Sequence, residues 1–162
     1  MNIDSIPIKM LDKLNEIKDI KLIIQNNIYL FDTNKEIINN LNKISILIEI
    51  SSIFKMIYIK EYFYLSKKGL KIIYILLKDI MFRIKNEFED IYNEYKKMKN
   101  VTFFIINDIN IASFTITNYF ISFSLFTKNG YYINHEMISY NHSSIIWGRR
   151  LFNYYKKISY VL

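Results

Sequence analysis

Few residues of this sequence could support acid–base or metal chemistry. The chain has two histidines, His135 and His142, and no cysteine, which excludes disulfides, thiolate metal sites and a cysteine nucleophile. His135 falls beside Glu136 in a predicted strand, so strict alternation directs the two side chains to opposite faces. No second His or Cys is near in sequence, which favours an ordinary strand position over a metal site. His142 fits the start of a helix. We predict no catalytic residue, metal or cofactor.

Two adjacent serines lie where a ligand could bind. Ser51 and Ser52 follow a predicted buried strand and open a predicted helix. Ligands of open α/β sheets bind at this end of the strands, where helix N-termini offer free N–H donors. Two capping serines explain the same pattern, and the capping preference favours that explanation. We keep both interpretations.

A second group of hydroxyls alternates along two neighbouring predicted strands. Thr115 and Thr117 lie on the first strand, Ser122 and Ser124 on the second, and phenylalanines flank them. They could line a mostly apolar pocket or form the solvent face of a meander. Trp147 could stack on a ligand, although its place in an apolar helix stripe is typical of a core residue. The predicted ligand-binding residues are Ser51, Ser52, Thr117, Asn118, Ser122, Ser124, His135 and Trp147.

The elements that would position these residues follow from the hydrophobic pattern. In the first half, helices and buried strands alternate, as in parallel βαβ units. We predict a helix start at Ser5-Ile6-Pro7, a strand at Lys21 to Ile24, and a helix at Asn34 to Asn42 opened by a capping box, Thr33-x-x-Glu36. Strands follow at Ile44 to Ile50, Leu70 to Leu77 and Val101 to Ile106, with helices at Ile53 to Lys68 and at Asp79 to Met98, the longest.

The second half changes to consecutive strands and a closing helix. We predict strands at Ile111 to Thr117, Phe120 to Phe126 and Tyr132 to Ser139, with a short hairpin turn at Lys128-Asn129-Gly130. A helix should begin near Asn141 and lay Trp147, Leu151, Tyr154 and Ile158 on the sheet. The fold class is therefore α/β, with one mixed sheet: a parallel βαβ first half, an antiparallel meander and helices on the faces.

Length and charge bound the function further. At 162 residues, without a linker or repeat, the chain is predicted to be one domain over residues 1–162. The uncharged span from Ile109 to Thr127 has eight Asn, Ser or Thr residues, unlike a membrane helix, and no signal peptide is evident. We expect a cytoplasmic protein without membrane contact. A net charge of +7 suits nucleic acid, but the lysines are spread along the chain, which favours ordinary solvated surface.

Several segments resemble one archaeal family. The closing region has a strand ending L-F, then K-N-G-Y, then a W-G helix ending L-F-x-Y-Y; earlier come I-S-S-I-F from Ile50, K-K-G-L-K-I-I-Y from Lys67 and N-V-T-F-F-I from Asn100. In order and spacing they are similar to the middle domain of methanogenesis regulatory proteins, which normally follows a winged-helix DNA-binding domain. The acidic residues usual after the hairpin Gly-Tyr and after W-G are replaced here by Ile133-Asn134 and Arg149-Arg150.

The resemblance implies a phospholipase-D-like sensor domain. We expect a non-catalytic domain that binds a small-molecule effector or mediates dimerisation, with DNA contacted only through a winged helix or a partner. The nearly all-round apolar helix after Ser52 supports a homodimer. Phospholipase-D-type catalysis needs the motif H-x-K, whereas Met137 and Ser144 stand two residues after the two histidines. The alternatives are a nucleic-acid binder using basic helix ends and a divergent phosphodiesterase.

Overall fold

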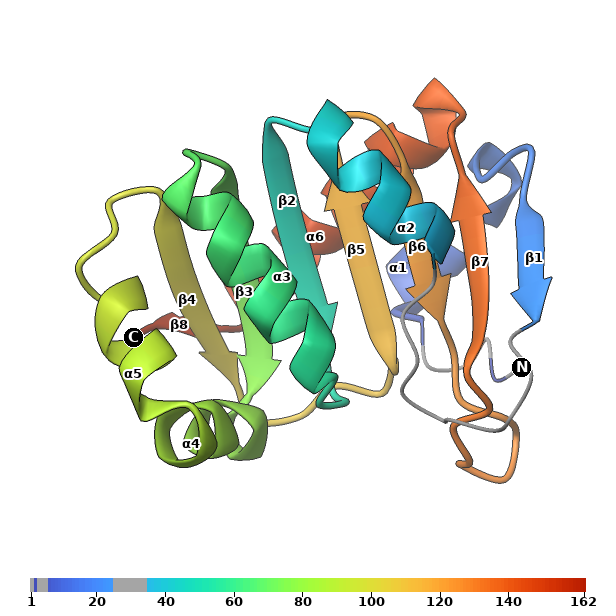
Figure 1. Ribbon diagram of the computed structural model, residues 1–162. Coiled ribbons are helices and arrows are strands. Elements are labelled where there is room, and N and C mark those ends of the chain that lie inside the picture. The colour runs from blue at the N-terminus through green and yellow to red at the C-terminus, as the bar shows by residue number, and fades with distance from the viewer. Residues whose placement is uncertain (1, 3–5, 25–34) are drawn as a thin grey trace.

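The computed structural model describes residues 2, 6–24 and 35–162. One eight-stranded sheet has the order β1-β7-β6-β5-β2-β3-β4-β8, with helices on both faces (Figure 1). β2, β3 and β4 pair in parallel, and the other neighbouring strands pair antiparallel, which confirms the predicted mixed sheet. The strands are β1 (Lys21–Ile24), β2 (Ile46–Ser51), β3 (Lys71–Leu77), β4 (Val101–Ile106), β5 (Ser113–Thr117), β6 (Ile121–Ser124), β7 (His135–Ser139) and β8 (Tyr160–Val161).

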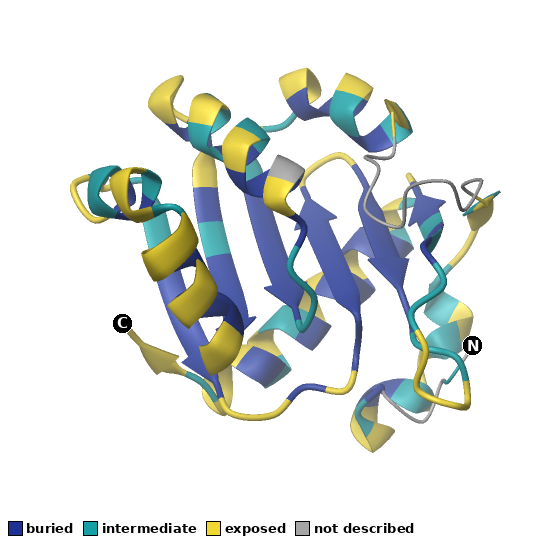
Figure 2. Cartoon of the chain, turned by 60° about the horizontal axis from the view of Figure 1, so that its bottom comes forward, coloured by how far each residue is buried: buried dark blue, intermediate teal, exposed yellow. Residues whose placement is uncertain are grey.

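Helices cover both faces of the sheet and divide the core into two layers. The α-helices are α1 (Ile8–Leu11), α2 (Lys35–Asn40), α3 (Met56–Lys67), α4 (Lys78–Glu87), α5 (Glu89–Tyr95) and α6 (His142–Lys157), with 3-10 turns η2 (Leu14–Glu16) and η3 (Leu41–Lys43). Side chains of α2, α3, α4 and α5 pack in one layer, and those of α1 and α6 in the other. Figure 2 shows buried central strands between helices with exposed outer faces.

The closing helix, α6, agrees best with the prediction. The side chain of Asn141 accepts a hydrogen bond from the backbone N–H of Ser143, and this caps the first turn of α6 as predicted. Trp147 and Leu151 are fully buried against the sheet. Ile158 is 55% exposed, so the predicted apolar stripe ends before it. Gly148 lets the helix approach closely, because a Cβ there would lie 3.0 Å from Ile121 Cγ2.

The helices of the first half differ from the prediction in three places. The helix after β2 begins at Met56 rather than Ile53, and its first turn receives no side-chain cap. The predicted helix from Asp79 to Met98 is interrupted at Phe88, whose φ of −136° is not helical, so α6 is longer than either piece. The N-terminal helix is one turn long, followed by η2. Ser5, Thr33 and Asn34 of the predicted helix starts lie outside the described residues.

The meander has shorter strands and a longer connection than predicted. Gly130 adopts the expected positive φ, +79°, and its N–H donates to the Thr127 carbonyl. However, β6 ends at Ser124 and β7 begins at His135, so the connection is a ten-residue loop rather than a tight hairpin. β8, which sequence reasoning missed, pairs with the outer edge of β4. The part of the chain that the structure describes has no helix of the length and apolar character needed to span a membrane.

Candidate functional site

Two rows of buried polar side chains cross the α3 face of the sheet. Antiparallel pairing places Thr115 of β5 beside Glu49 of β2, and Ser122 of β6 beside Thr115. Two residues further along each strand, the second row comprises Ser51, Ser113 and Ser124. Strand alternation directs all six side chains to the same face, where the neighbouring core is otherwise apolar. Polar groups there need internal partners, because they are shielded from water.

Two glutamates hold hydrogen bonds within these rows. The Thr115 hydroxyl donates to Glu49 Oε2 at 2.7 Å. The Ser122 hydroxyl donates to Oε1 of Glu136, on β7, at 3.1 Å. Both carboxyls are buried. The site therefore brings Glu49 and Glu136, which lie 87 residues apart in sequence, onto one face of the sheet.

A buried lysine joins the two glutamates. Lys55 lies in the loop between β2 and α3, with its ammonium 5.3 Å from the centre of the Tyr58 ring and 5.4 Å from that of Tyr132. Burial by itself would lower the pKa of Lys55, but the Glu136 carboxylate, the Tyr132 hydroxyl and Glu49 raise it above its usual value. Lys55 is therefore a cation, held between aromatic rings and beside carboxyl groups.

Burial dominates the chemistry of Glu49. It raises the pKa of Glu49 to about 8, against the hydrogen bond from Thr115 and the charge of Lys55, both of which favour the carboxylate. The negative charge of Glu136 adds to the rise. Near neutral pH the Glu49 carboxyl is thus largely protonated, and can donate as well as accept a hydrogen bond.

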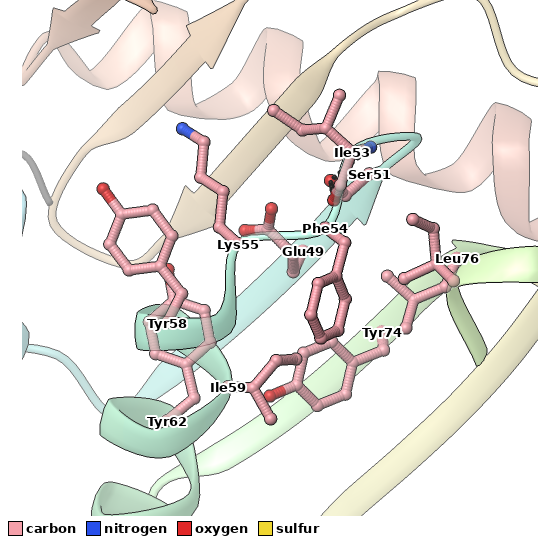
Figure 3. Close-up of a pocket in the computed structure, with 11 residues that line it drawn as sticks. Glu49, Ser51, Ile53, Phe54, Lys55, Tyr58, Ile59, Tyr62, Tyr74 and Leu76 are labelled. Carbon is pink, nitrogen blue, oxygen red and sulfur yellow. Dashed lines mark hydrogen bonds between the residues drawn. The ribbon is translucent and has the colours of Figure 1, made fainter. Parts of the chain in front are cut away.

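A small cavity adjoins Glu49 at the carboxyl end of β2. It has a volume of about 20 Å³, and its walls come from β2, β3, α3, α4 and the loop before α3. Figure 3 shows Lys55, Tyr58 and Tyr62 on one side of Glu49, with Phe54 and Tyr74 on the other. A cavity of this size accommodates about one water molecule. A larger ligand would have to displace part of the wall.

The hydroxyl of Tyr62 is an unused hydrogen-bonding group in this wall. Tyr62 is 1% exposed, and its hydroxyl makes no hydrogen bond of ordinary geometry within the described residues, although the nearby Thr115 hydroxyl partly opposes the rise in pKa that burial causes. The Ser124 hydroxyl, in the second polar row, is also buried without one. Buried polar groups in native proteins are nearly always hydrogen-bonded, and an unpaired one requires an explanation. The adjoining cavity has room for one water molecule or one ligand group that would supply this partner.

The structure brings only some of the predicted ligand-binding residues to this site. Ser51 lines the cavity, while Ser122 and Ser124 lie in the two polar rows. Ser51 and Ser52 do not cap α3 as predicted, because α3 begins four residues beyond Ser52. Their hydroxyls donate instead to the carbonyls of Ile53 and Ile111, which fixes the loop that carries Lys55.

Four predicted residues lie elsewhere. The Thr117 hydroxyl accepts hydrogen bonds within the turn before Phe120, and Asn118 Oδ1 accepts from the backbone of Ser45, both at the opposite edge of the sheet. Trp147 is fully buried in the other core layer, with its ring centre 5.7 Å from that of Phe114. His135 is half-buried on β7, and alternation places it on the face opposite Glu136, as predicted.

Sequence reasoning missed the residues that define the site, although one signal was present. Glu49 is the only charge in the apolar segment I-S-I-L-I-E-I from Ile44. A carboxyl in a strand covered on both faces must be buried, and buried acids are enriched at functional sites. Lys55, Tyr62 and Glu136 gave no comparable signal, because only the tertiary fold brings them to Glu49. The alternative of a solvent face for the meander hydroxyls is wrong, since Thr115, Thr117, Ser122 and Ser124 are all buried.

The fold is that of phospholipase-D-like domains. Nuc, a phospholipase D family member from Salmonella typhimurium, aligns over 89% of this chain and 97% of its own, with a TM-score of 0.57 and 8% identity. Phosphatidylserine synthase from Haemophilus influenzae aligns over 88% of this chain and 39% of its own, with a TM-score of 0.61 and 8% identity. At these identities the likeness concerns the fold alone.

An archaeal chromatin protein shares the same fold. TrmBL2, described as an archaeal chromatin protein with a novel mode of DNA binding, aligns over 89% of this chain with a TM-score of 0.69 and 13% identity. This chain covers 54% of the TrmBL2 chain, about half its length. No curated protein sequence matches the chain.

The family follows from the sequence itself. Residues 30–158 match the model of the middle domain of the methanogenesis regulatory protein FilR1. The match covers most of the chain, which therefore belongs to this family of regulatory-protein domains, as the sequence motifs indicated. The chain is a domain of the kind found in archaeal transcription regulators.

Proposed function

We propose that this is a non-catalytic ligand-sensing domain, and that its effector binds at the cavity beside Glu49. The observation that carries the proposal is the hydroxyl of Tyr62, which is fully buried in the cavity wall, has no hydrogen-bond partner among the described residues and lies on the same side of Glu49 as Lys55. Membership of a regulatory-protein family supports a sensing role rather than catalysis.

The chemistry of the wall defines the ligand class. The Tyr62 hydroxyl can donate to an acceptor, and the protonated Glu49 can donate or accept. Aromatic and aliphatic side chains complete the wall, among them Phe54, Tyr58 and Ile59. A small polar molecule with one apolar side fits these groups, as in most small-molecule sites. Lys55 lines the cavity and interacts with Glu136, so the two charges have opposite signs.

Because the cavity is small, an effector can bind only if the conformation of the protein changes. About 20 Å³ is too small for a metabolite, so an effector must displace the loop at residues 52–55 and the first turn of α3. α3 is an outer helix, and Met56 and Tyr64 on it are about half exposed. A displaced α3 would present a changed surface to another domain or subunit. Binding then shifts the equilibrium between two arrangements, because only the open one accepts the ligand.

The test uses a variant that leaves the fold intact. Replacing Tyr62 by Phe removes an unpaired buried hydroxyl, which should not destabilise the protein. Native mass spectrometry of freshly purified protein would show a retained small molecule, and thermal unfolding with amines, polyols and short carboxylates would reveal ligands added in solution. Tyr155→Phe, which removes a hydroxyl in the other core layer, is the matched control.

We expect a retained mass or a rise in the unfolding temperature for the wild type and Tyr155→Phe, and a reduced effect for Tyr62→Phe. An undiminished effect in Tyr62→Phe would place the ligand elsewhere. No retained mass and no stabilisation across the panel would contradict a sensing role. The same mass spectra report the homodimer predicted from the apolar helix, since a dimer has twice the mass of one chain.

A further inference from the structure

Two lysine clusters that are 25 or more residues apart in sequence meet at one edge of the sheet. Because β3 and β4 are parallel, their amino-terminal ends lie side by side, at the upper left of Figure 1. The turn from α3 to β3 carries one cluster and the turn from α5 to β4 the other. With Lys43, which ends η3 just before β2, they form what we call the basic edge: Lys43, Lys67, Lys68, Lys71, Lys96, Lys97 and Lys99.

Hydrogen bonds fix the two turns against each other. The side-chain amide of Asn100 donates to the carbonyls of Ser66 at 2.9 Å and Leu70 at 2.7 Å. The backbone N–H of Ile72 donates to the Asn100 carbonyl at 2.8 Å. One residue of the second turn therefore binds both ends of the first. The lysines project from a rigid base rather than from separate mobile loops.

The charge of the basic edge is almost unopposed. All seven lysines are exposed. Within the described residues, the only ion pair that a lysine of this edge makes is that of Lys97 with Glu94, at 2.7 Å. The Glu94 carboxylate also interacts with Lys67, and these two lysines lower its pKa. Lys43 donates to the neutral amide of Asn40. Five lysines of the basic edge thus have no acidic partner within the described residues.

A favourable interaction with helix dipoles accounts for only some of the lysines of the basic edge. A lysine in the last turn of a helix interacts favourably with its dipole, but the effect fades within that turn. Lys67 and Lys96 lie at the ends of α3 and α5, where this explanation applies. Lys71 and Lys99 lie beyond the helices, Lys71 as the first residue of β3 and Lys99 just before β4. Their positive charge requires a different explanation.

We propose that the basic edge binds the phosphate backbone of duplex DNA. Adjacent strands lie about 4.8 Å apart, so the edge from β2 to β4 spans about 10 Å. Duplex DNA carries one negative charge per about 1.7 Å of its axis, which gives about six charges over that length. The lysine density of the edge therefore matches that of the phosphates. Lysine contacts to phosphate are independent of sequence, so the edge supports positioning on DNA rather than recognition of bases.

The third cationic group of the chain supplies a matched control. Arg149, Lys156 and Lys157 belong to α6, which packs on the other face of the sheet and ends near the far end of β4. All three are exposed. A triple Gln variant at these positions changes the net charge as much as Lys68→Gln, Lys71→Gln and Lys99→Gln do together. Comparing the two triple variants distinguishes the effect of where the charges lie from the effect of the net charge.

The test measures binding of the whole chain to a labelled duplex by fluorescence anisotropy between about 50 and 200 mM salt. For the wild type we expect affinity to fall steeply with salt, with about 0.9 of a log unit per log unit of salt for each phosphate contacted. The basic-edge variant should bind at least about tenfold more weakly, with a salt slope smaller by about 3, and the α6 variant should stay within about twofold of the wild type.

Any of three results overturns the proposal. Equal weakening in both triple variants would show that only net charge matters, and no salt-dependent binding at the lowest salt would exclude a DNA surface. Equal affinity for heparin or single-stranded RNA would assign the edge to polyanions in general instead of duplex DNA. Far-ultraviolet circular dichroism of both variants confirms that each is folded.

Discussion

The hydroxyl of Thr115 donates to the carboxyl of Glu49 across the β2–β5 pair, at 2.7 Å and away from solvent. β2 is the strand at which the sheet changes from parallel to antiparallel pairing, with β3 on one side and β5 on the other. Ligand sites of α/β sheets favour such positions. The only acid of β2 is therefore held at the boundary between the two halves of the fold.

Glu49→Gln should change how stability depends on pH. The folded protein retains the Glu49 proton up to about pH 8, whereas the unfolded chain releases it near the ordinary value of 4.5. Because the folded state holds more protons in this window, the free energy of unfolding falls as pH rises from 4.5 to 8. Gln cannot ionise, so the variant should match the wild type near the acid end and exceed it by a few kcal/mol near pH 8, at about 1.4 kcal/mol per unit of pKa shift.

Urea unfolding of both proteins at several values of pH across the window measures this difference. Comparing the two proteins removes the contributions of the other groups that titrate there. Parallel profiles of the wild type and Glu49→Gln would show that Glu49 is ionised in the folded protein, contrary to its buried position.

Lys55→Met should destabilise the protein, because the buried carboxylate of Glu136 would lose its positively charged partner. Lys55 interacts with the carboxylate of Glu136, and both are buried. Removing one partner of a buried ion pair typically lowers the free energy of unfolding by about 3 to 5 kcal/mol, because the other charge stays buried without compensation. Lys60→Met, at an exposed position of α3, should change stability by less than about 0.5 kcal/mol.

A double-mutant cycle distinguishes lost charge from lost packing. If the uncompensated carboxylate is the cause, adding Glu136→Gln to Lys55→Met should restore part of the stability, with a coupling energy above about 1 kcal/mol. Additive effects of the two substitutions, measured by urea unfolding, would show that the two groups do not interact.

Gly148→Ala should be destabilising even though alanine favours helices. A Cβ at this position would lie 3.0 Å from Ile121 Cγ2 and 3.1 Å from Ile116 Cγ1, so α6 would have to move away from β5 and β6. Overpacking of a core costs about 1 to 3 kcal/mol, and exchanging Gly for Ala within a helix returns up to about 1. We expect a net loss of about 1 kcal/mol in urea unfolding.

Truncating the contacted side chain tests the cause. In the background of Ile121→Ala, which removes the nearer of the two contacts but leaves that with Ile116, Gly148→Ala should be less destabilising than in the wild type. A loss of the same size in that background would mean that steric contact with Ile121 is not responsible.

The sequence predicted those features of the fold that depend on local patterns. Asn141 marks a helix start by its own side chain, and the β-branched runs of β2, β3 and β4 indicate buried strands without reference to the rest of the molecule. The interruption at Phe88 could not be inferred in this way, because the apolar stripe continues across it and only packing sets the angle between α4 and α5. The site was even less predictable from local patterns. Glu49 and Glu136 come near each other only because the meander places β7 two strands from β5.

The cap of α6 can be tested by exchanging the side-chain amide nitrogen of Asn141 for an oxygen. Asn141 Oδ1 accepts from the Ser143 N–H at 3.0 Å, while its Nδ2 donates to Asp19 Oδ2 at 2.7 Å. Asn141→Ala removes both bonds and should lower the free energy of unfolding by about 1 to 2 kcal/mol. Asn141→Asp keeps a capping oxygen but sets a second carboxylate against Asp19, so its loss should diminish as salt screens the repulsion. Asp19→Asn combined with Asn141→Asp should remove that salt dependence in thermal unfolding, because the amide of residue 19 can then donate to the new carboxylate. If Asn141→Asp is no more salt-sensitive than the wild type, the contact between residues 19 and 141 does not hold the N-terminal segment to the start of α6.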